Sequence, residues 1–194
     1  MKDEIVVYRS KTGFTRKYAE WIAEELECEC VPFESVTHEQ LARYRSVVIG
    51  GCVRYEAVDA AKQIADMIAG LPDVVLFIVG ATPMTDRKAT GYMLKRTYNK
   101  SEKFRFVPHF YLQGGLNMKE LGAVERMLIR LMVLIIKSMP KATPEMKEVA
   151  SRMSHSADYS NRSNICALVE YVKSGRPDCG TGQPAVQDIR HRSH

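Results

Sequence analysis

A short run of hydroxyl residues and one glycine near the N-terminus has the chemistry of a phosphate-binding loop. The run is Ser10-Lys11-Thr12-Gly13-Phe14-Thr15, and it lies between an apolar segment and an amphipathic one. Its hydroxyl groups can donate hydrogen bonds to phosphate oxygens, and Gly13 permits a tight turn that points successive backbone N–H groups inward. A helix starting directly after the run would add the positive end of its dipole. The run therefore predicts a phosphate ester as ligand, with Lys11 or Arg9 at the rim.

The run differs from the two common phosphate loops of nucleotide-binding proteins. It does not end in the Gly-Lys-Ser/Thr of a Walker loop, and it lacks the Gly-x-Gly-x-x-Gly of dinucleotide sites. An ordinary strand-to-helix turn capped by Thr15 is the alternative that the six residues leave open. Their position at the first strand-to-helix turn of the chain favours the phosphate loop.

The segments around this loop predict a parallel sheet covered by helices on both faces. Short apolar runs alternate with segments of helical periodicity along the chain. The predicted strands are residues 4–8, 29–33, 46–49, 74–79, 104–106 and 110–112. The predicted helices are residues 15–26, 37–44, 57–69, 118–139, 143–153 and 165–173, with a loop or an inserted helix at 83–101. At 194 residues, the chain suits one such domain with a tail.

The pattern Ser-x-Thr-Gly-x-Thr after the first strand resembles the FMN phosphate loop of flavodoxins. The order of the predicted elements over residues 4–174 is also similar to theirs. The resemblance implies a flavodoxin-like fold, a three-layer α/β/α sandwich with a five-stranded parallel sheet, and FMN as the cofactor. It assigns the phosphate of FMN to residues Ser10, Lys11, Thr12, Gly13, Phe14 and Thr15.

The same fold brings the loops after the first, third and fourth strands together at the carboxyl edge of the sheet, where open α/β sheets bind ligands. The second of these loops contains Gly51, Cys52, Val53, Arg54 and Tyr55. We expect Gly51 to let a planar ring approach the backbone, Tyr55 to stack on the ring and Arg54 to pair with an anion. A solvated helix entry is the alternative for Arg54 and Tyr55.

The third loop at this edge follows the apolar run 74–79. It reads Gly80-Ala81-Thr82. Its backbone amides can hydrogen bond the polar edge of isoalloxazine. Gly80, Ala81 and Thr82 therefore complete the predicted cofactor site.

Three segments resemble, more closely, the flavodoxin-type, menaquinone-dependent protoporphyrinogen dehydrogenase family. They are residues 48–55, the aromatic run 110–116 and the Met/Leu/Ile-rich helix 118–139. In that family FMN accepts electrons from protoporphyrinogen and passes them to a membrane quinone, and a long insertion near the last strands distinguishes it from small flavodoxins. Residues 83–139 hold the corresponding place here. Two alternatives stay open: a one-electron carrier without its own substrate, and a flavin-free binding protein of the same fold.

Charge bears on the choice of partner. The chain has 28 Lys+Arg against 23 Asp+Glu, a dispersed net charge of +5 that predicts no nucleic-acid binding. Flavodoxins that carry electrons between soluble partners are usually strongly acidic, whereas a basic chain with an apolar run at 127–136 favours a carboxylate-bearing porphyrin or an anionic bilayer. We therefore expect a redox partner or a quinone or porphyrin-like substrate, with peripheral membrane contact through helix 118–139. A core helix or a homodimer interface is the alternative for that helix.

Neither a catalytic side chain nor a metal site is predicted. The sequence shows no paired carboxylates, no Ser/His/Asp arrangement and no metal-ligand spacing, as expected where a flavin performs the redox chemistry. The five cysteines form no CxxC pair, and Cys28 and Cys30 are expected to be half-buried thiols on one face of a strand. A chain that starts directly as a strand, without a transmembrane segment, is expected in the cytoplasm, free or on the cytoplasmic side of a membrane. The domain is predicted to span residues 1–175, followed by a flexible tail at 176–194.

Overall fold

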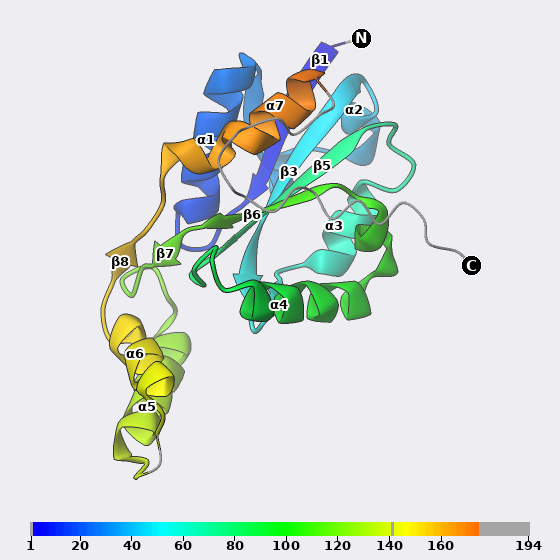
Figure 1. The fold of residues 1–194 in the computed structure, drawn as a ribbon. Helices are drawn as coiled ribbons and strands as arrows, with labels where there is room; N and C mark the ends of the chain where they lie inside the picture. The colour runs from blue at the N-terminus through cyan, green and yellow to red at the C-terminus, as the bar shows by residue number, and fades with distance from the viewer. Residues whose placement is uncertain (1, 141, 175–194) are drawn as a thin grey trace, which may run out of the picture.

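The computed structural model describes residues 2–140 and 142–174, which form a parallel sheet between two layers of helices (Figure 1). The five parallel strands run in the order β2 (Glu29–Pro32), β1 (Lys2–Arg9), β3 (Tyr44–Arg54), β5 (Val74–Gly80) and β6 (His109–Gln113). Counted along the chain, these parallel strands have the order 2-1-3-4-5 of flavodoxin-like sheets. The predicted fold class is therefore confirmed. The predicted tail, residues 176–194, lies outside the described residues.

Two hydrophobic cores sandwich the sheet, because neighbouring residues of a strand point to opposite faces. On β1, Ile5 and Val7 pack in the core under α2 (His38–Leu41), α3 (Ala61–Met67) and α4 (Arg87–Lys100), whereas Val6 packs in the other core. That second core lies under α1 (Phe14–Leu26) and α7 (Cys166–Ser174). Cys30 on β2 and Cys28 just before that strand both pack against it as half-buried thiols, and burial raises the pKa of each to about 11.

A helical hairpin projects from one end of the domain (Figure 1). It starts at β7 (Gly115–Leu116), which pairs antiparallel with β8 (Ala157–Asp158), and consists of α5 (Ala123–Ser138) and α6 (Pro144–Met153). We call the described residues 115–140 and 142–158 the arm. Thr143 caps α6, since its hydroxyl accepts a hydrogen bond from the Met146 N–H at 3.3 Å, and Pro144 takes the first helical position as predicted. No helix in the described part of the chain is long and apolar enough to cross a membrane.

Strand β3 is longer than predicted and continues through Arg54 instead of ending at Ile49. Its end pairs antiparallel with the short strand β4 (Ala57–Val58). Tyr55 and Glu56 form the turn between them with φ of 49° and 65°, the positive values of a two-residue hairpin turn. The segment predicted as the second loop is therefore mostly strand, with only its last residue in a turn.

Other boundaries also differ from the prediction. Residues 104–106 were expected as a strand, but they lie in the 3-10 helix η2 (Glu102–Phe106). Residues 87–100, expected as a loop or an inserted helix, form α4 of the helical layer. The large excursion from the domain is consequently the arm, which begins later than the insertion predicted at 83–139. The remaining 3-10 helices are η1 (Phe33–Ser35) and η3 (Arg162–Ile165).

Candidate functional site

The loop between β1 and α1 is folded by its own hydrogen bonds. The Ser10 hydroxyl accepts a hydrogen bond from the Gly13 N–H at 3.2 Å, and the Lys17 N–H donates to the Gly13 carbonyl at 2.9 Å. Gly13 has φ of +89°, a left-handed conformation that glycine adopts without a steric penalty. A Cβ at Gly13 would meet nothing within 4 Å, so the loop needs glycine for its backbone conformation and not for space.

The start of α1 offers donors for an anion. Its first turn holds no acidic side chain, and the capping residue Gly13 makes no side-chain hydrogen bond to the helix. The first N–H groups of a helix have no partner within the helix and carry its positive dipole end. The Ser10 hydroxyl, which accepts from Gly13, still has its own proton to donate. These donors fit a phosphate monoester, which is the group that FMN would place here.

The six residues of this loop are not equally accessible. Lys11 and Gly13 are exposed, and Ser10, Thr12 and Phe14 are half-buried. Thr15 lies inside the first turn of α1 and is only 1% exposed. The structure therefore places Thr15 below the loop surface that the other five form. Its contact with a phosphate stays a prediction.

The second predicted segment lies directly beside this loop. Arg9 at the end of β1 is the register partner of Gly51 on β3. Burial raises the pKa of the Cys52 thiol. Gly51 is buried, and a Cβ there would lie 2.7 Å from Cγ1 of Val58. Gly51 therefore permits a close approach of Val58, and its contact with a planar ring stays a prediction.

Arg9 itself is engaged within the fold. Its guanidinium lies 3.4 Å from the Asp59 carboxylate and 3.3 Å from the Glu34 carboxylate. It also lies 5.7 Å from the centre of the Phe33 ring. Arg9 therefore fastens the end of β1 to η1 and to the segment after β4.

Arg54 and Tyr55 lie at the tip of the β3–β4 hairpin. Tyr55 is 66% exposed, and the Arg54 guanidinium lies 5.0 Å from the centre of its ring. Arg54 also forms an ion pair with Glu125 in the first turn of α5. A hydrogen bond from the Gly122 N–H at 3.1 Å, together with Arg54, lowers the pKa of Glu125. The anion that Arg54 meets in the structure is therefore a carboxylate of the arm, and Val53 before it pairs with Val58 of β4.

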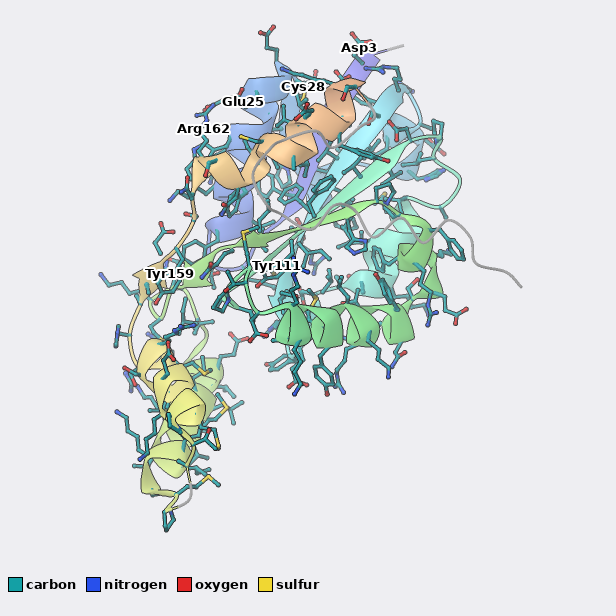
Figure 2. All side chains as sticks on the ribbon, viewed as in Figure 1. Asp3, Glu25, Cys28, Tyr111, Tyr159 and Arg162 are labelled. Carbon is teal, nitrogen blue, oxygen red and sulfur yellow. The ribbon has the colours of Figure 1, made fainter. Side chains whose placement is uncertain are left out.

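The third predicted segment begins at the end of β5. Gly80 is buried, and a Cβ there would lie 2.6 Å from the Tyr111 hydroxyl. That hydroxyl donates a hydrogen bond to the Thr82 carbonyl at 2.9 Å, and burial raises the pKa of Tyr111 to about 12. Ala81 is exposed and Thr82 is half-buried, so both lie at the carboxyl edge as predicted. Figure 2 shows Tyr111 on β6, on the side of the sheet that faces α4.

Two tyrosines outside the predicted site residues organise this edge. Tyr111 holds the third segment through its hydrogen bond to the Thr82 carbonyl. The Tyr18 hydroxyl on α1 donates to the Gln113 carbonyl at 2.6 Å and accepts hydrogen bonds from the Asn161 N–H and the Asn164 side chain, both at 3.1 Å. Tyr18 could have been noticed as a hydroxyl inside an apolar helix stripe, because such a group needs partners when buried.

A groove of about 510 Å³ lies between the phosphate-loop candidate and the base of the arm. One side is formed by Thr12, Gly13, Phe14 and Lys17, and the other by Leu116, Asn117, Lys119, Ser156, Ala157 and Asp158. An ion pair between Lys17 Nζ and Asp158 Oδ2, 2.7 Å apart, bridges the two sides. At the junction of arm and domain, the Tyr159 N–H donates to the Gly114 carbonyl at 3.0 Å (Figure 2). The base of the arm is consequently part of the candidate site.

Comparisons with known proteins agree with this architecture. A family model described as a flavodoxin domain matches residues 5–143, which include the three candidate segments and α5. No curated protein matches the chain.

Similar solved structures include several flavodoxins. One from the domain Archaea is 21% identical, with a TM-score of 0.38, and the match covers 47% of this chain and 74% of that one. Oxidised flavodoxin 1 from Bacillus cereus is 14% identical, with a TM-score of 0.40 and coverages of 71% and 99%. The two-electron reduced flavodoxin of Megasphaera elsdenii is 18% identical, with a TM-score of 0.38 and coverages of 77% and 97%.

Proposed function

The chain belongs to the flavodoxin domain family, and we propose from that premise that it is an FMN-dependent dehydrogenase that passes electrons to a quinone. The family makes it a flavodoxin-like flavoprotein with FMN as its cofactor. When bound, FMN supplies the redox chemistry, and the chain binds it, orients it and limits its contact with water.

The observation that carries the cofactor assignment is the loop at the start of α1. The Ser10 and Thr12 hydroxyls and the first N–H groups of α1 would hold the phosphate, with Lys11 as an exposed positive charge beside it. Tyr55 and the segment after Gly80 would flank the ring system at the neighbouring strand ends.

Features of the arm favour a reaction partner that is bulky and either apolar or anionic. The Arg54–Glu125 ion pair joins the hairpin beside the candidate site to α5, and the base of the arm borders the groove next to Gly13. Lys17 in that groove is paired with Asp158, whereas Lys119 is exposed, and a basic side chain there favours a carboxylate-bearing substrate such as a porphyrin. A quinone suits the exposed apolar surface of α5.

The first experiment concerns the cofactor. We expect the purified chain to be yellow and to release FMN on denaturation, or to take up added FMN with quenching of flavin fluorescence. Colourless protein that rejects FMN would sink the redox function and favour a flavin-free binding protein.

The second experiment separates a dehydrogenase from an electron carrier. FMN-loaded protein is mixed anaerobically with protoporphyrinogen and a menaquinone analogue, and porphyrin fluorescence is followed with time. We expect a rate that needs both the flavin and the quinone, and Gly13→Val, which blocks the loop turn, serves as the flavin-deficient control. If fluorescence grows no faster than in protein-free buffer, the carrier function is the better assignment.

A further inference from the structure

Helix α5 exposes an unusually large share of its apolar side chains. We define the apolar face as Val124, Met127, Leu128, Leu131, Met132, Leu134, Ile135 and Met139, all of which are exposed. Val124 and Leu134 are 66% and 64% exposed. Isolated exposed apolar residues are ordinary on protein surfaces, but a contiguous group of this size marks a surface that binds something.

The spacing of these residues places them on one side of the helix. Val124, Met127, Leu131 and Ile135 follow one another at intervals of three and four residues, and Leu128 lies four residues after Val124, so the five form a stripe along α5. The sixteen residues of α5 make that stripe about 24 Å long. The opposite side of α5 packs against α6, where Val133 is buried. The apolar face is therefore not the side that holds the hairpin together.

Most of the charged residues of α5 are basic. The helix carries Arg126, Arg130 and Lys137 but a single acid, Glu125, which pairs with Arg54 of the domain. Arg130 and Lys137 are exposed, whereas the two basic and two acidic residues of α6 add no net charge. An apolar stripe with basic flanks is the composition of helices that lie in the interface of anionic membranes.

We propose that the apolar face of α5 docks on an anionic lipid bilayer, with α5 lying in the plane of the interface. The helix is too short and too charged to cross the membrane, whereas its exposed stripe can enter the headgroup boundary while the basic side chains remain at the phosphates. A second copy of the chain fits less well, because a two-fold contact through this face would gather the basic residues of both copies with few acids to offset them. Anionic headgroups offset them directly.

Membrane docking deepens the proposed function but does not depend on it. Val124 and Glu125 are neighbours, so the apolar face begins beside the carboxylate that binds Arg54 at the candidate site. Docking through this face would hold that site near the bilayer, where a quinone dissolves. The docking itself uses only residues of the arm and requires no flavin.

The test measures binding of the full-length protein to vesicles by co-sedimentation. We expect binding to vesicles of phosphatidylcholine containing one third phosphatidylglycerol, and much weaker binding to phosphatidylcholine alone. Raising the salt from about 0.1 M to about 1 M shortens the Debye length from about 10 Å to about 3 Å and should release most of the protein. Vesicle binding that depends neither on anionic lipid nor on the salt concentration would overturn the proposal.

Two variants test the face and its charges separately. Leu131→Glu combined with Leu134→Glu should abolish vesicle binding, and Arg130→Gln combined with Lys137→Gln should weaken it by about fivefold for each charge removed. Phe106→Glu is the matched control, because Phe106 is 84% exposed on η2, outside the arm, and its replacement should leave binding unchanged. FMN affinity and the circular dichroism spectrum report that each variant is folded.

The outcomes distinguish this proposal from the proposed function. Vesicle binding by protein that rejects FMN supports docking while contradicting the redox function. Equal vesicle binding by the leucine double variant and the wild type contradicts docking through α5. A concentration-dependent dimer that the leucine double variant abolishes, in protein that binds no vesicles, assigns the face to a second copy and overturns the proposal.

Discussion

Gly13 has a left-handed backbone conformation and also belongs to the predicted phosphate loop. Its φ of +89° is natural for glycine, while any larger side chain there is strained even though a Cβ would meet open space. We expect Gly13→Ala to lower the free energy of unfolding by about 1 kcal/mol and to weaken FMN binding, because strain shifts the donors of the loop. Urea unfolding and FMN titration measure the two effects.

A second glycine provides the control for this prediction. Gly70 has φ of +82° and also has open space where a Cβ would lie, but it is outside the three candidate segments. Gly70→Ala should cost about the same stability as Gly13→Ala, since the strain is alike, and leave FMN affinity unchanged. If Gly13→Ala binds FMN as tightly as Gly70→Ala does, Gly13 does not belong to the cofactor site.

On the scale of single elements, the start of β6 contains a half-buried histidine that links stability to pH. Burial lowers the pKa of His109 below its ordinary value of 6.5, and its ring nitrogens lie 3.2 Å from the Val107 carbonyl and 3.4 Å from the Tyr98 hydroxyl. Between the lowered pKa and 6.5, the unfolded chain binds more protons than the folded one. The free energy of unfolding should therefore fall as the pH drops below about 6.5 and level off below the folded pKa.

The variant His109→Gln isolates this contribution. It keeps hydrogen-bonding groups at the position but has no proton to bind in this pH range. Urea unfolding at pH values on either side of 6.5 should show a smaller loss of stability in the variant than in the wild type. An unchanged loss would assign the pH dependence to other groups.

Some helices and strands could be predicted from the sequence alone, and others could not. Apolar patterns located α1 by its helical periodicity, and β1 and β5 as continuous apolar runs that are buried on both faces of the sheet. They failed for η2, where Phe104 and Phe106, two positions apart, predict one face of a strand, whereas the backbone is helical and Phe104 is buried while Phe106 is exposed. They also ended β3 too early, because Tyr55 and Glu56 turn at positive φ without a glycine to signal the turn. Local patterns cannot report pairing with β4.

In the candidate site, too, some features could be predicted from the sequence and others could not. The phosphate-loop candidate is a local pattern of adjacent residues, so it is readable in the sequence. Tyr18 and Tyr111 reach their partners only through the fold, 95 and 29 positions away along the chain for Gln113 and Thr82. The Arg54–Glu125 ion pair likewise joins residues 71 positions apart. Side chains that organise a site through such distant contacts leave little trace in a single sequence.

For the molecule as a whole, the arm is separable from the domain that bears the candidate cofactor site. Neither hydrophobic core of the sheet includes a residue of α5 or α6 among the described residues. The arm leaves and returns through adjacent strands, with Leu116 opposite Ala157. Replacing residues 117–156 by Asn-Gly, the preferred two-residue hairpin turn, should therefore close β7 onto β8 and leave the domain folded.

We expect this shortened chain to keep its FMN affinity, because the proposed phosphate donors lie in residues 10–15 and not in the arm. It should also keep most of its stability, because the deletion removes the partly exposed Arg54–Glu125 pair, worth about 1 kcal/mol, and leaves both hydrophobic cores intact. It should still accept electrons from dithionite but lose vesicle binding and quinone reduction together. FMN titration, urea unfolding, vesicle co-sedimentation and anaerobic turnover measure these properties. If quinone reduction persisted at the wild-type rate without the arm, electron transfer to the quinone would be independent of the arm, and the apolar face would serve attachment alone.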